Sequence, residues 1–390
     1  MTLLVLSILF VLNDLSSGVP AWWKDGSNAP RFVHSSAQGV RVDSAQASLT
    51  SDSALSGCLA TFAGPVVTLA GDQGYQGFKV GRWEDGTRFD ARGGVWTSMM
   101  DGFDDRRGLV PIQIGADWGT NIDGAGRRDL WSSKFNTPPQ PTVFCFFGGA
   151  IVGTQPLTAT WGETKRLGGG AAITINGARG SVIEGVRVHN HHDAFVPYRN
   201  DGFILRGNWV SYNRDDCIEN DANAEGTVED NLFDGCYVFY SGTTPDSATT
   251  QPHGAGASGT LRIVGNLIKM QNMPGPYDRN NQLGNRSKSG YEQIWKTRSN
   301  AGVPKVVLRD NVIAFEVPRD RGVTSLTGAN VDIIECANNT ILWLGSGSFP
   351  GALPSGGEDC FRIVTGSQAQ ERWRELRQRW IDDHPNVARL

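Results

Sequence analysis

Charge is sparse in this sequence, and no long stretch of one sign occurs in it. Charged residues make up 19% of the 390 residues, and 36 basic against 40 acidic side chains leave a net charge of −4. We therefore expect no nucleic-acid partner, because proteins that bind nucleic acids gather lysine and arginine on one face. The nucleophile elbow, the phosphate-binding loop and the paired-histidine zinc motif are also missing, which argues against the enzyme classes that they mark.

No membrane span is expected, because the apolar run near the N-terminus, Leu3–Leu12, is too short to cross a bilayer. The run fits the hydrophobic part of a signal peptide, with Val19–Ala21 as a small-residue cleavage site. We therefore expect residues 1–21 to be a signal peptide and the mature protein to be secreted or periplasmic. The alternative is an N-terminal helix that caps the core.

The six cysteines are widely and irregularly spaced, and no two of them have the CxxC spacing of a zinc site. In an exported protein one or two disulfides are possible, but the spacing does not say which cysteines pair. Cys336 falls on a core position of the repeat described next, so we expect it to be a buried thiol.

Glycine is frequent, with 49 residues, and it separates short apolar runs, which predicts many turns between short strands. One pattern recurs: apolar, any, apolar, any, any, Asn, any, apolar. Its clear copies are Phe203–Val210, Leu261–Ile268, Val306–Ile313 and Ile334–Ile341, with looser copies at Val228–Phe233 and Ile183–Val188.

The repeat predicts the fold. The step from Ile183 to Leu205 is 22 residues, which suits one coil of three short strands and is too short for a strand–helix–strand crossover. The Asn fits the tight bend between two strands, and stacked Asn side chains can hydrogen-bond from coil to coil. We therefore predict an all-β, right-handed parallel β-helix with an Asn ladder formed by Asn208, Asn231, Asn266, Asn311 and Asn339.

The domain organisation follows from the repeat. Residues 22–140 contain early coils without a clear register, and residues 141–345 form the core of the β-helix. Two polar insertions, 241–260 and 271–291, are expected to form the walls of a groove. Residues 346–390 form a tail whose helical pattern at 368–381 predicts a cap over the solenoid end. Nothing in the sequence indicates the oligomeric state.

Acidic residues gather at one coil edge, where Asp215 and Asp216 precede a predicted strand that contains Glu219. Asp193 lies one repeat earlier, so we expect it to stack beside Asp216 at one strand spacing, roughly 5 Å. Crowded carboxylates raise the pKa of at least one of them, which gives the protonated acid and ionised base that hydrolysis of a glycosidic bond requires. The alternatives are turn-capping aspartates and a calcium site.

The segment Phe203–Ile218, with Asp215-Asp216-Cys217, resembles the catalytic coil of polygalacturonase-type glycoside hydrolases of the pectin-lyase-like β-helix superfamily. The segments His189–Phe195 and Gly148–Gly153 are similar to other segments of that family, and Lys296 matches its later lysine. The resemblance implies that Asp193, Asp215 and Asp216 are the catalytic acids. This sequence departs from the family at Asp234–Tyr237, where a histidine is expected; His253 could replace it.

We therefore expect an inverting-type glycoside hydrolase that cleaves a polysaccharide without a cofactor. The alternatives are a lyase or epimerase acting on a uronate polymer, with calcium on the aspartate cluster, and a non-catalytic adhesin or structural protein. The residues expected to bind substrate are His192, Arg214, Glu219, Tyr240, His253, Tyr291, Trp295, Lys296 and Arg298.

Overall fold

A computed structural model describes the chain from residue 55 to residue 390 with internal gaps. The gaps are 75–77, 81–82, 99–110, 116–142, 167–170, 243–255, 279–283, 285, 298–301, 319–325, 327–329, 352, 354–356 and 358. The expected signal peptide and much of the expected N-terminal part, 22–140, lie outside the described residues.

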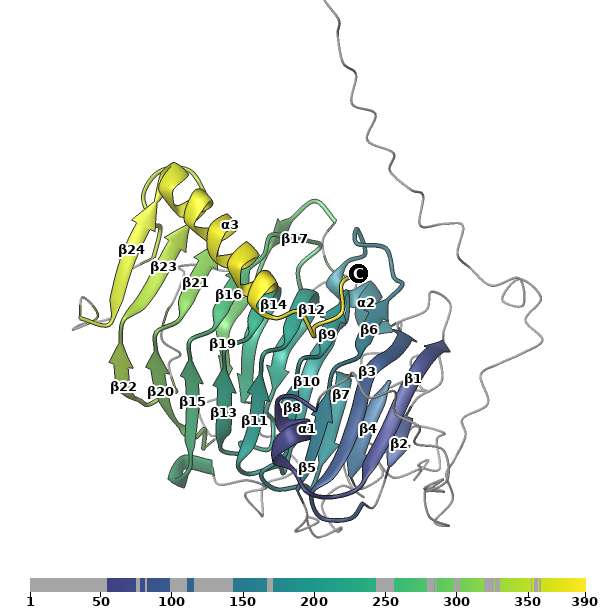
Figure 1. Cartoon of the computed structure of the whole chain (residues 1–390). Helices are drawn as coiled ribbons and strands as arrows, with labels where there is room; N and C mark the ends of the chain where they lie inside the picture. The colour runs from purple at the N-terminus through teal and green to yellow at the C-terminus, as the bar shows by residue number, and fades with distance from the viewer. Residues whose placement is uncertain are drawn as a thin grey trace, which may run out of the picture.

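The architecture is all-β: among the described residues, 22 strands join one continuous sheet that winds through successive coils as a solenoid (Figure 1). All the pairings described in this sheet are parallel, and strands far apart in sequence lie side by side because each coil stacks on the last. The short strands β17 (Met273–Pro274) and β18 (Ser289–Gly290) pair with each other and are antiparallel. The α-helices of the described residues are α1 (Cys58–Thr61), α2 (Trp161–Arg166) and α3 (Gly366–Asp383).

The strands fall into three rows, and strands in one row pair from coil to coil. The first row contains β5 (Phe144–Phe147), β8 (Val182–Glu184), β11 (Phe203–Arg206), β13 (Gly226–Glu229), β15 (Thr260–Val264), β20 (Lys305–Arg309) and β22 (Ile333–Ala337). The second row contains β6 (Ala150–Gly153), β9 (Arg187–His189), β16 (Leu267–Met270), β21 (Val312–Phe315), β23 (Asn339–Trp343) and β24 (Phe361–Thr365).

The third row carries the acidic coil edge. It contains β2 (Phe78–Val80), β4 (Ile112–Gly115), β7 (Ala171–Asn176), β10 (Asp193–Tyr198) and β19 (Gln293–Thr297). Two long strands, β12 (Trp209–Glu219) and β14 (Leu232–Gly242), run through both the second and the third row. The first coils also include β1 (Val66–Gly74) and β3 (Thr87–Ser98), which pair with each other.

The bend between the first and second rows needs a left-handed backbone, but the repeated Asn does not supply it. The residue before each Asn has the positive φ: 60° at Gly207, 67° at Gly265 and 57° at Asp310. Glycine, Asp and Asn tolerate this conformation best, which explains the residue types at these positions. The repeated Asn residues have ordinary backbone angles, and their side chains are buried inside the solenoid.

The repeated Asn side chains bond from one coil to the next. The Nδ2 group of Asn208 donates to Oδ1 of Asn231 at 3.0 Å, and that of Asn231 donates to Oδ1 of Asn266 at 2.9 Å. The same contact joins Asn266 to Asn311 at 3.1 Å and Asn311 to Asn339 at 3.0 Å. Each Oδ1 also accepts the backbone N–H of the preceding Asn, so one buried side chain satisfies polar groups of two coils.

Replacing Asn266 by Leu is expected to lower the free energy of unfolding by about 1–3 kcal/mol, because the backbone N–H and the side chain of Asn231 lose their acceptor in a buried site. Urea denaturation of the variant measures the loss. Asn272→Leu is the control, since the side chain of Asn272 is exposed. Equal stability of Asn266→Leu and the parent would contradict the structural role of the bonded Asn side chains.

Helix α3 is present where the sequence predicts a helix, but it does not cap the solenoid end. It lies along the second row and crosses several coils (Figure 1). Its Trp380 Nε1 donates to the carbonyl of Asp230 at 3.1 Å, and Arg377 Nε contacts Asp234 at 2.6 Å. The outward side chains of the second row explain this position, because their apolar members pack under the helix: Leu232, Leu267, Ala314 and Leu342.

At the C-terminal end of the solenoid, a loop residue packs on the core instead. The ring of Phe349 lies 5.7 Å from Phe315 and 6.2 Å from Trp343.

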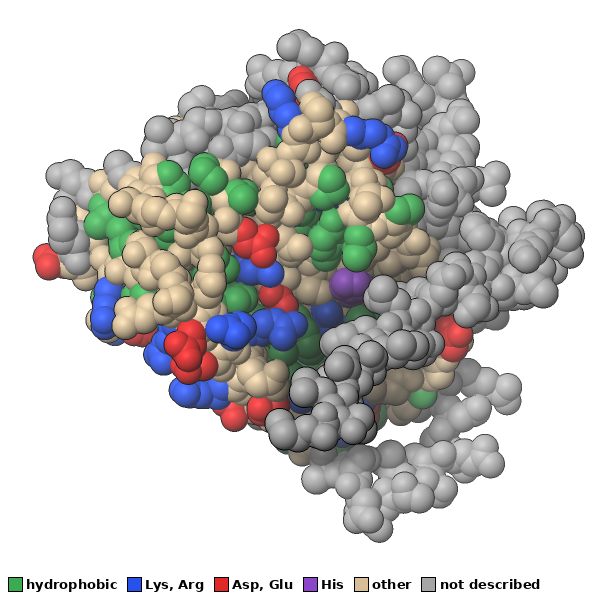
Figure 2. All heavy atoms as spheres, turned by 90° about the horizontal axis from the view of Figure 1, so that it is seen from above, with side chains coloured by type: hydrophobic (Ala, Val, Ile, Leu, Met, Phe, Trp, Pro, Cys, Tyr) green, Lys and Arg blue, Asp and Glu red, His purple; other side chains and the backbone are tan. Residues whose placement is uncertain are grey.

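Charges of both signs lie next to one another on the face seen from above (Figure 2). On the second row, Lys269 contacts Asp234 at 3.4 Å. None of the described helices is long and apolar enough to cross a membrane.

The docking of α3 should depend weakly on pH through His384. Burial lowers the pKa of His384, but hydrogen bonds to Asp230 and to the carbonyl of Trp380 outweigh it and raise the pKa above its ordinary value. The stabilisation is therefore present below the unfolded pKa and is lost as pH rises through the folded one. We expect His384→Gln to remove about 0.5–1 kcal/mol at pH 5.5 and much less at pH 8.5. An equal loss at both pH values, measured by urea denaturation, would contradict this.

Three disulfides use all six cysteines: Cys58–Cys145, Cys217–Cys236 and Cys336–Cys360. The expectation that Cys336 is a free buried thiol is therefore wrong. The repeat indicates which residues point inward, but not that Cys360, beyond an irregular segment, returns beside Cys336.

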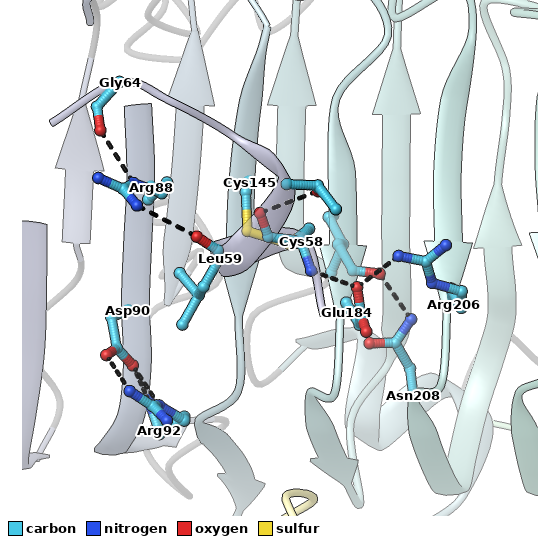
Figure 3. The surroundings of a disulfide bond; sticks show 12 residues. Cys58, Leu59, Gly64, Arg88, Asp90, Arg92, Cys145, Glu184, Arg206 and Asn208 are labelled. Carbon is cyan, nitrogen blue, oxygen red and sulfur yellow. Dashed lines mark hydrogen bonds and ion pairs between the residues drawn. A yellow bond between two sulfur atoms is a disulfide. The ribbon is translucent and has the colours of Figure 1, made fainter. Parts of the chain in front are cut away.

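The first disulfide fixes α1 against the outer side of the first row (Figure 3). The backbone N–H of Cys58 donates to the carboxylate of Glu184 at 2.9 Å, and Arg206 donates to the same oxygen at 2.7 Å. Residues close to the N-terminal end of the described chain are thus held by two neighbouring coils.

Candidate active site

The acidic residues of two successive coils meet on the third row. Phe195 of β10 pairs with Ile218 of β12, so Asp193 and Asp216 occupy corresponding positions two residues earlier. The backbone N–H of Asp216 donates to Asp193 Oδ1 at 3.0 Å. The predicted stacking of Asp193 beside Asp216 is therefore confirmed. The regular pairing of β12 is interrupted between Asn213 and Asp216, which places Asp215 at an irregularity of the strand.

Five residues form a ring of contacts, which we call the carboxylate ring: Asp193, His192, Asp215, Lys296 and Asp216. His192 Nδ1 lies 3.0 Å from Asp193 Oδ2, and its Nε2 lies 3.6 Å from Asp215 Oδ2. Lys296 Nζ lies 3.5 Å from Asp215 Oδ1 and 2.8 Å from Asp216 Oδ2. The bond from the Asp216 backbone to Asp193 closes the ring. Residues from β10, β12 and β19, far apart in sequence, thus share one site.

The ring is nearly removed from water. Asp216 is 1% exposed and His192, Asp193 and Asp215 are 3–5% exposed, whereas the Lys296 side chain is 30% exposed. Charged groups are stable at such burial only when they are paired, as they are here. Asp193 bonds a backbone N–H, as a capping aspartate does, but Asp215 and Asp216 contact the side chains of His192 and Lys296.

The surroundings of the ring shift the pKa values of Asp193 and Asp216 in opposite directions. Burial raises the pKa of Asp193, but His192 and Lys296 outweigh it and hold that pKa below its ordinary value. Burial, reinforced by Asp215, raises the pKa of Asp216 well above its ordinary value despite Lys296. The pKa of Lys296 is lowered by burial but raised more by Asp215 and Asp216, so the ammonium remains charged. The site therefore keeps an ionised carboxylate beside a carboxyl group that retains its proton.

Glu219 extends the acidic site along β12. It is half-buried, and burial, followed by Asp193 and Asp221, raises its pKa well above the ordinary value. It pairs in register with Ser241, whose hydroxyl donates to Asp221 at 3.1 Å.

Residues 154–166 and 273–277 pack beside the ring. Arg214 donates to the carbonyls of Ala159 and Pro274 at 2.6 and 2.8 Å, and so joins these two segments. The guanidinium is buried and bonds the backbone of the protein, whereas we expected Arg214 to bind substrate. In α2, the ring of Trp161 lies 5.7 Å from that of His192.

Three aromatic residues expected to stack on sugars are core residues instead. Tyr240 is fully buried, with its hydroxyl bonded to Asn220 Nδ2 at 3.1 Å, and Trp295 lies 5.6 Å from it. Tyr291 is 1% exposed and packs against Phe315. In β14 and β19 the inward positions are those of Tyr240 and Trp295, and the outward ones are those of Ser241 and Lys296. His253 and Arg298, also expected at the site, lie outside the described residues.

Trp161 was not among the residues expected at the site, although the sequence contains a signal for its helix. Thr160-Trp161-Gly162-Glu163 is a capping box: the Thr160 N–H donates to the Glu163 side chain at 2.8 Å, and the Glu163 N–H donates to the Thr160 hydroxyl at 3.2 Å. The box predicts a helix that starts at Trp161. Nothing in the sequence indicates that this helix lies against His192, because that contact depends on how residues 154–166 cross the coils.

Calcium does not fit the carboxylate ring. Calcium takes six to eight oxygen ligands, whereas an imidazole stands between Asp193 and Asp215, and the ammonium of Lys296 already contacts Asp215 and Asp216. A second cation would have to displace Lys296. We therefore derive no chemistry through calcium at this site.

The chain matches no family model, no curated protein and no solved structure. The resemblance carried by Asp215-Asp216-Cys217 therefore stays a prediction, and the function has to be argued from the geometry of the ring.

Proposed function

We propose that the protein is a glycoside hydrolase that cleaves a polysaccharide, with Asp193, Asp215 and Asp216 as its acid–base groups. We also propose that the solenoid is a right-handed parallel β-helix of the pectin-lyase-like type, with the bonded Asn side chains as its ladder. One observation carries the functional proposal: three carboxyl groups from two coils meet in a ring where the pKa of Asp193 is held below its ordinary value and that of Asp216 is raised well above it.

The roles follow from the charges. Asp193, with a lowered pKa, is the base that takes the proton of the attacking water. Asp216, with a raised pKa, retains the proton that it supplies to the leaving glycosidic oxygen, and Asp215 lies beside it on the same ammonium group. Lys296 holds that pair in place through its contacts with both carboxyl groups.

The spacing of the carboxyl groups limits where the water lies. One oxygen each of Asp193 and Asp215 lies within 4.8 Å of the other and of a His192 nitrogen. Most inverting hydrolases separate their two carboxyl groups by roughly 6.5–9.5 Å to hold a water between them. An inverting mechanism here therefore requires the water to lie beside Asp193 and not directly between the two carboxyl groups.

Export is part of the proposal. Disulfides persist in oxidising compartments, and all six cysteines of this chain are paired, which supports a secreted or periplasmic enzyme. A polysaccharide substrate outside the cell is consistent with such a location.

A panel of neutral and acidic polysaccharides tests the proposal. The parent protein should release reducing ends from at least one polymer, and a chelator should not change the rate. Release that the chelator abolishes, with a product that absorbs as an unsaturated uronate, would replace hydrolysis by lyase chemistry. No release from any polymer, together with binding to one, would favour the non-catalytic adhesin.

A further inference from the structure

We infer that the disulfide between Cys217 and Cys236 positions the carboxylate ring, because it holds the irregular part of β12 that contains Asp215. The inference rests on the proposed function, since it assigns the disulfide to the same acid–base unit. Both cysteines are fully buried in the core of the solenoid, behind the ring, and they act on it through the backbone of β12.

Next to the ring, β12 contains one residue more than β14. Asn213 pairs with Cys236, and the next pair in register is Asp216 with Val238. Between these two pairs β12 has two residues and β14 has one, and Asp215 is the second of the two. An extra residue of this kind is a β-bulge, which interrupts the regular bonding to the neighbouring strand and re-aims a side chain. The bulge therefore sets the direction of the Asp215 carboxylate.

Backbone bonds fix the bulge to only one of its two neighbouring coils. Toward the preceding coil, the N–H groups of Arg214 and Asp215 donate to the carbonyls of His191 and His192 at 2.7 and 2.8 Å. Toward the following coil, the regular pairing with β14 is interrupted along the bulge. On that side the position of the bulge depends on another link.

The disulfide supplies this link. Cys217 follows the bulge in β12, whereas Cys236 of β14 is the partner of Asn213, which precedes the bulge. With their Cα atoms 5.9 Å apart, the two cysteines join β12 and β14 diagonally across the bulge. Side chains alternate along a strand, so Cys217 points into the core and the adjacent Asp216 points to the ring. The covalent bond thus holds the bulge from behind the carboxylates.

A small shift of the bulge is enough to disturb the ring. Lys296 Nζ lies 3.5 Å from Asp215 Oδ1 and 2.8 Å from Asp216 Oδ2. A displacement of about 1 Å weakens such contacts and can lower turnover on the order of 10²-fold. Asp193 lies on β10, which pairs with β7, so the base keeps its place when the bulge moves. Loss of the disulfide should therefore act on the proton-donating side of the site.

Removal of the disulfide tests the inference, and another disulfide of the chain is the matched control. Cys217→Ala with Cys236→Ala opens a link between residues 19 apart, and Cys336→Ala with Cys360→Ala opens one between residues 24 apart. Similar spans should give similar losses of stability. The control disulfide lies away from the third row, because Cys336 belongs to β22 and Cys360 directly precedes β24.

The two double variants should differ in turnover. On a polysaccharide that the parent cleaves, the pair without Cys217–Cys236 should lower kcat on the order of 10²-fold and leave KM nearly unchanged, while the control pair keeps the parent values. Cys217→Val with Cys236→Ala refills part of the core and replaces the first pair if that pair does not fold. Equal kcat values in the two double variants, per folded molecule, would overturn the inference while the proposed function stands.

Hydrogen exchange tests the positioning without a substrate. In the variant without Cys217–Cys236, the amides of Arg214 and Asp215 should exchange on the order of tenfold faster than in the parent and in the control pair. The amides of β10 should keep the parent rate. Mass spectrometry of peptides from the two strands measures both rates. Unchanged exchange at Arg214 and Asp215 would overturn the inference, whether or not any polysaccharide is cleaved.

Discussion

Asp193→Asn, Asp215→Asn and Asp216→Asn are each expected to lower turnover by about 10²–10⁴-fold, which is the usual cost of losing a general acid or base. Asn keeps the shape of the side chain and can still accept the hydrogen bond that Asp193 accepts from the Asp216 backbone. The substitution therefore removes the charge and the transferable proton and leaves the packing of the coils in place. The three variants should keep the fold of the parent, and the loss of turnover should appear in kcat.

The matched control for these variants is Asp234→Asn. Asp234 is a buried carboxylate in the next coil, and it is paired with Arg377 at 2.6 Å and with Lys269 at 3.4 Å, away from the carboxylate ring. Its variant should lose some stability and keep full turnover. The proposal would be contradicted if the three ring variants unfolded like capping mutants and kept parent turnover per folded molecule.

The pH profile of the parent should extend to unusually low pH. Because the pKa of Asp193 is held below its ordinary value, the base remains ionised in acid and the acid limb should lie below the range of a free aspartate. The limb reports the coupled ring and not a single residue.

Lys296→Met is expected to cost the low end of about 3–5 kcal/mol of unfolding free energy at neutral pH, because it leaves buried carboxylates without their cation. The ammonium contacts Asp216 at 2.8 Å and Asp215 at 3.5 Å, and the 30% exposure of its side chain moderates the cost. Methionine retains the apolar part of the lysine side chain, so the loss of unfolding free energy reports the removal of the positive charge. Turnover should fall as well, since the proton-donating pair loses its anchor.

The loss of unfolding free energy in Lys296→Met should become smaller as pH falls. Without Lys296, burial raises the pKa of Asp216 further, so the folded variant binds more protons than the unfolded chain and its stability decreases with rising pH. Urea denaturation at pH 4.5 and 7.5 measures this. Lys269→Met is the control, because Asp234 keeps Arg377 as a second cation when Lys269 is removed. A loss that is no larger at pH 7.5 than at pH 4.5 would contradict the account.

The coil-to-coil stacking could be predicted from the sequence because it repeats. The 22-residue step from Ile183 to Leu205 reappears as the pairing of Leu205 with Ile183, and it also predicted that Asp193 lies beside Asp216. The backbone of the bend could not be predicted in the same way. The left-handed residue is the one before the Asn, and it is Gly207 in one coil and Asp310 in another, so no single residue type marks it.

Long insertions explain what the sequence did not reveal. β15 and β16 separate β14 from β19 in the sequence, and the long connections on both sides of them hide the register that places Tyr240 and Trp295 inward. The contact between His192 and Trp161 depends on how residues 154–166 cross the coils, and the position of α3 depends on the apolar outer side of the second row. These features are set by tertiary packing, so short sequence patterns do not predict them.

The most direct test of the central claim is proton NMR of a polysaccharide digest. With a polymer that the parent cleaves, new reducing-end anomeric signals should grow with time, and the first anomer to appear gives the stereochemical course. The digest should contain no olefinic signal, and the Asp193→Asn protein should give the same spectrum as polymer alone. Olefinic signals, or equal reducing-end signals from the parent and Asp193→Asn, would contradict the assignment of the carboxylate ring to hydrolysis.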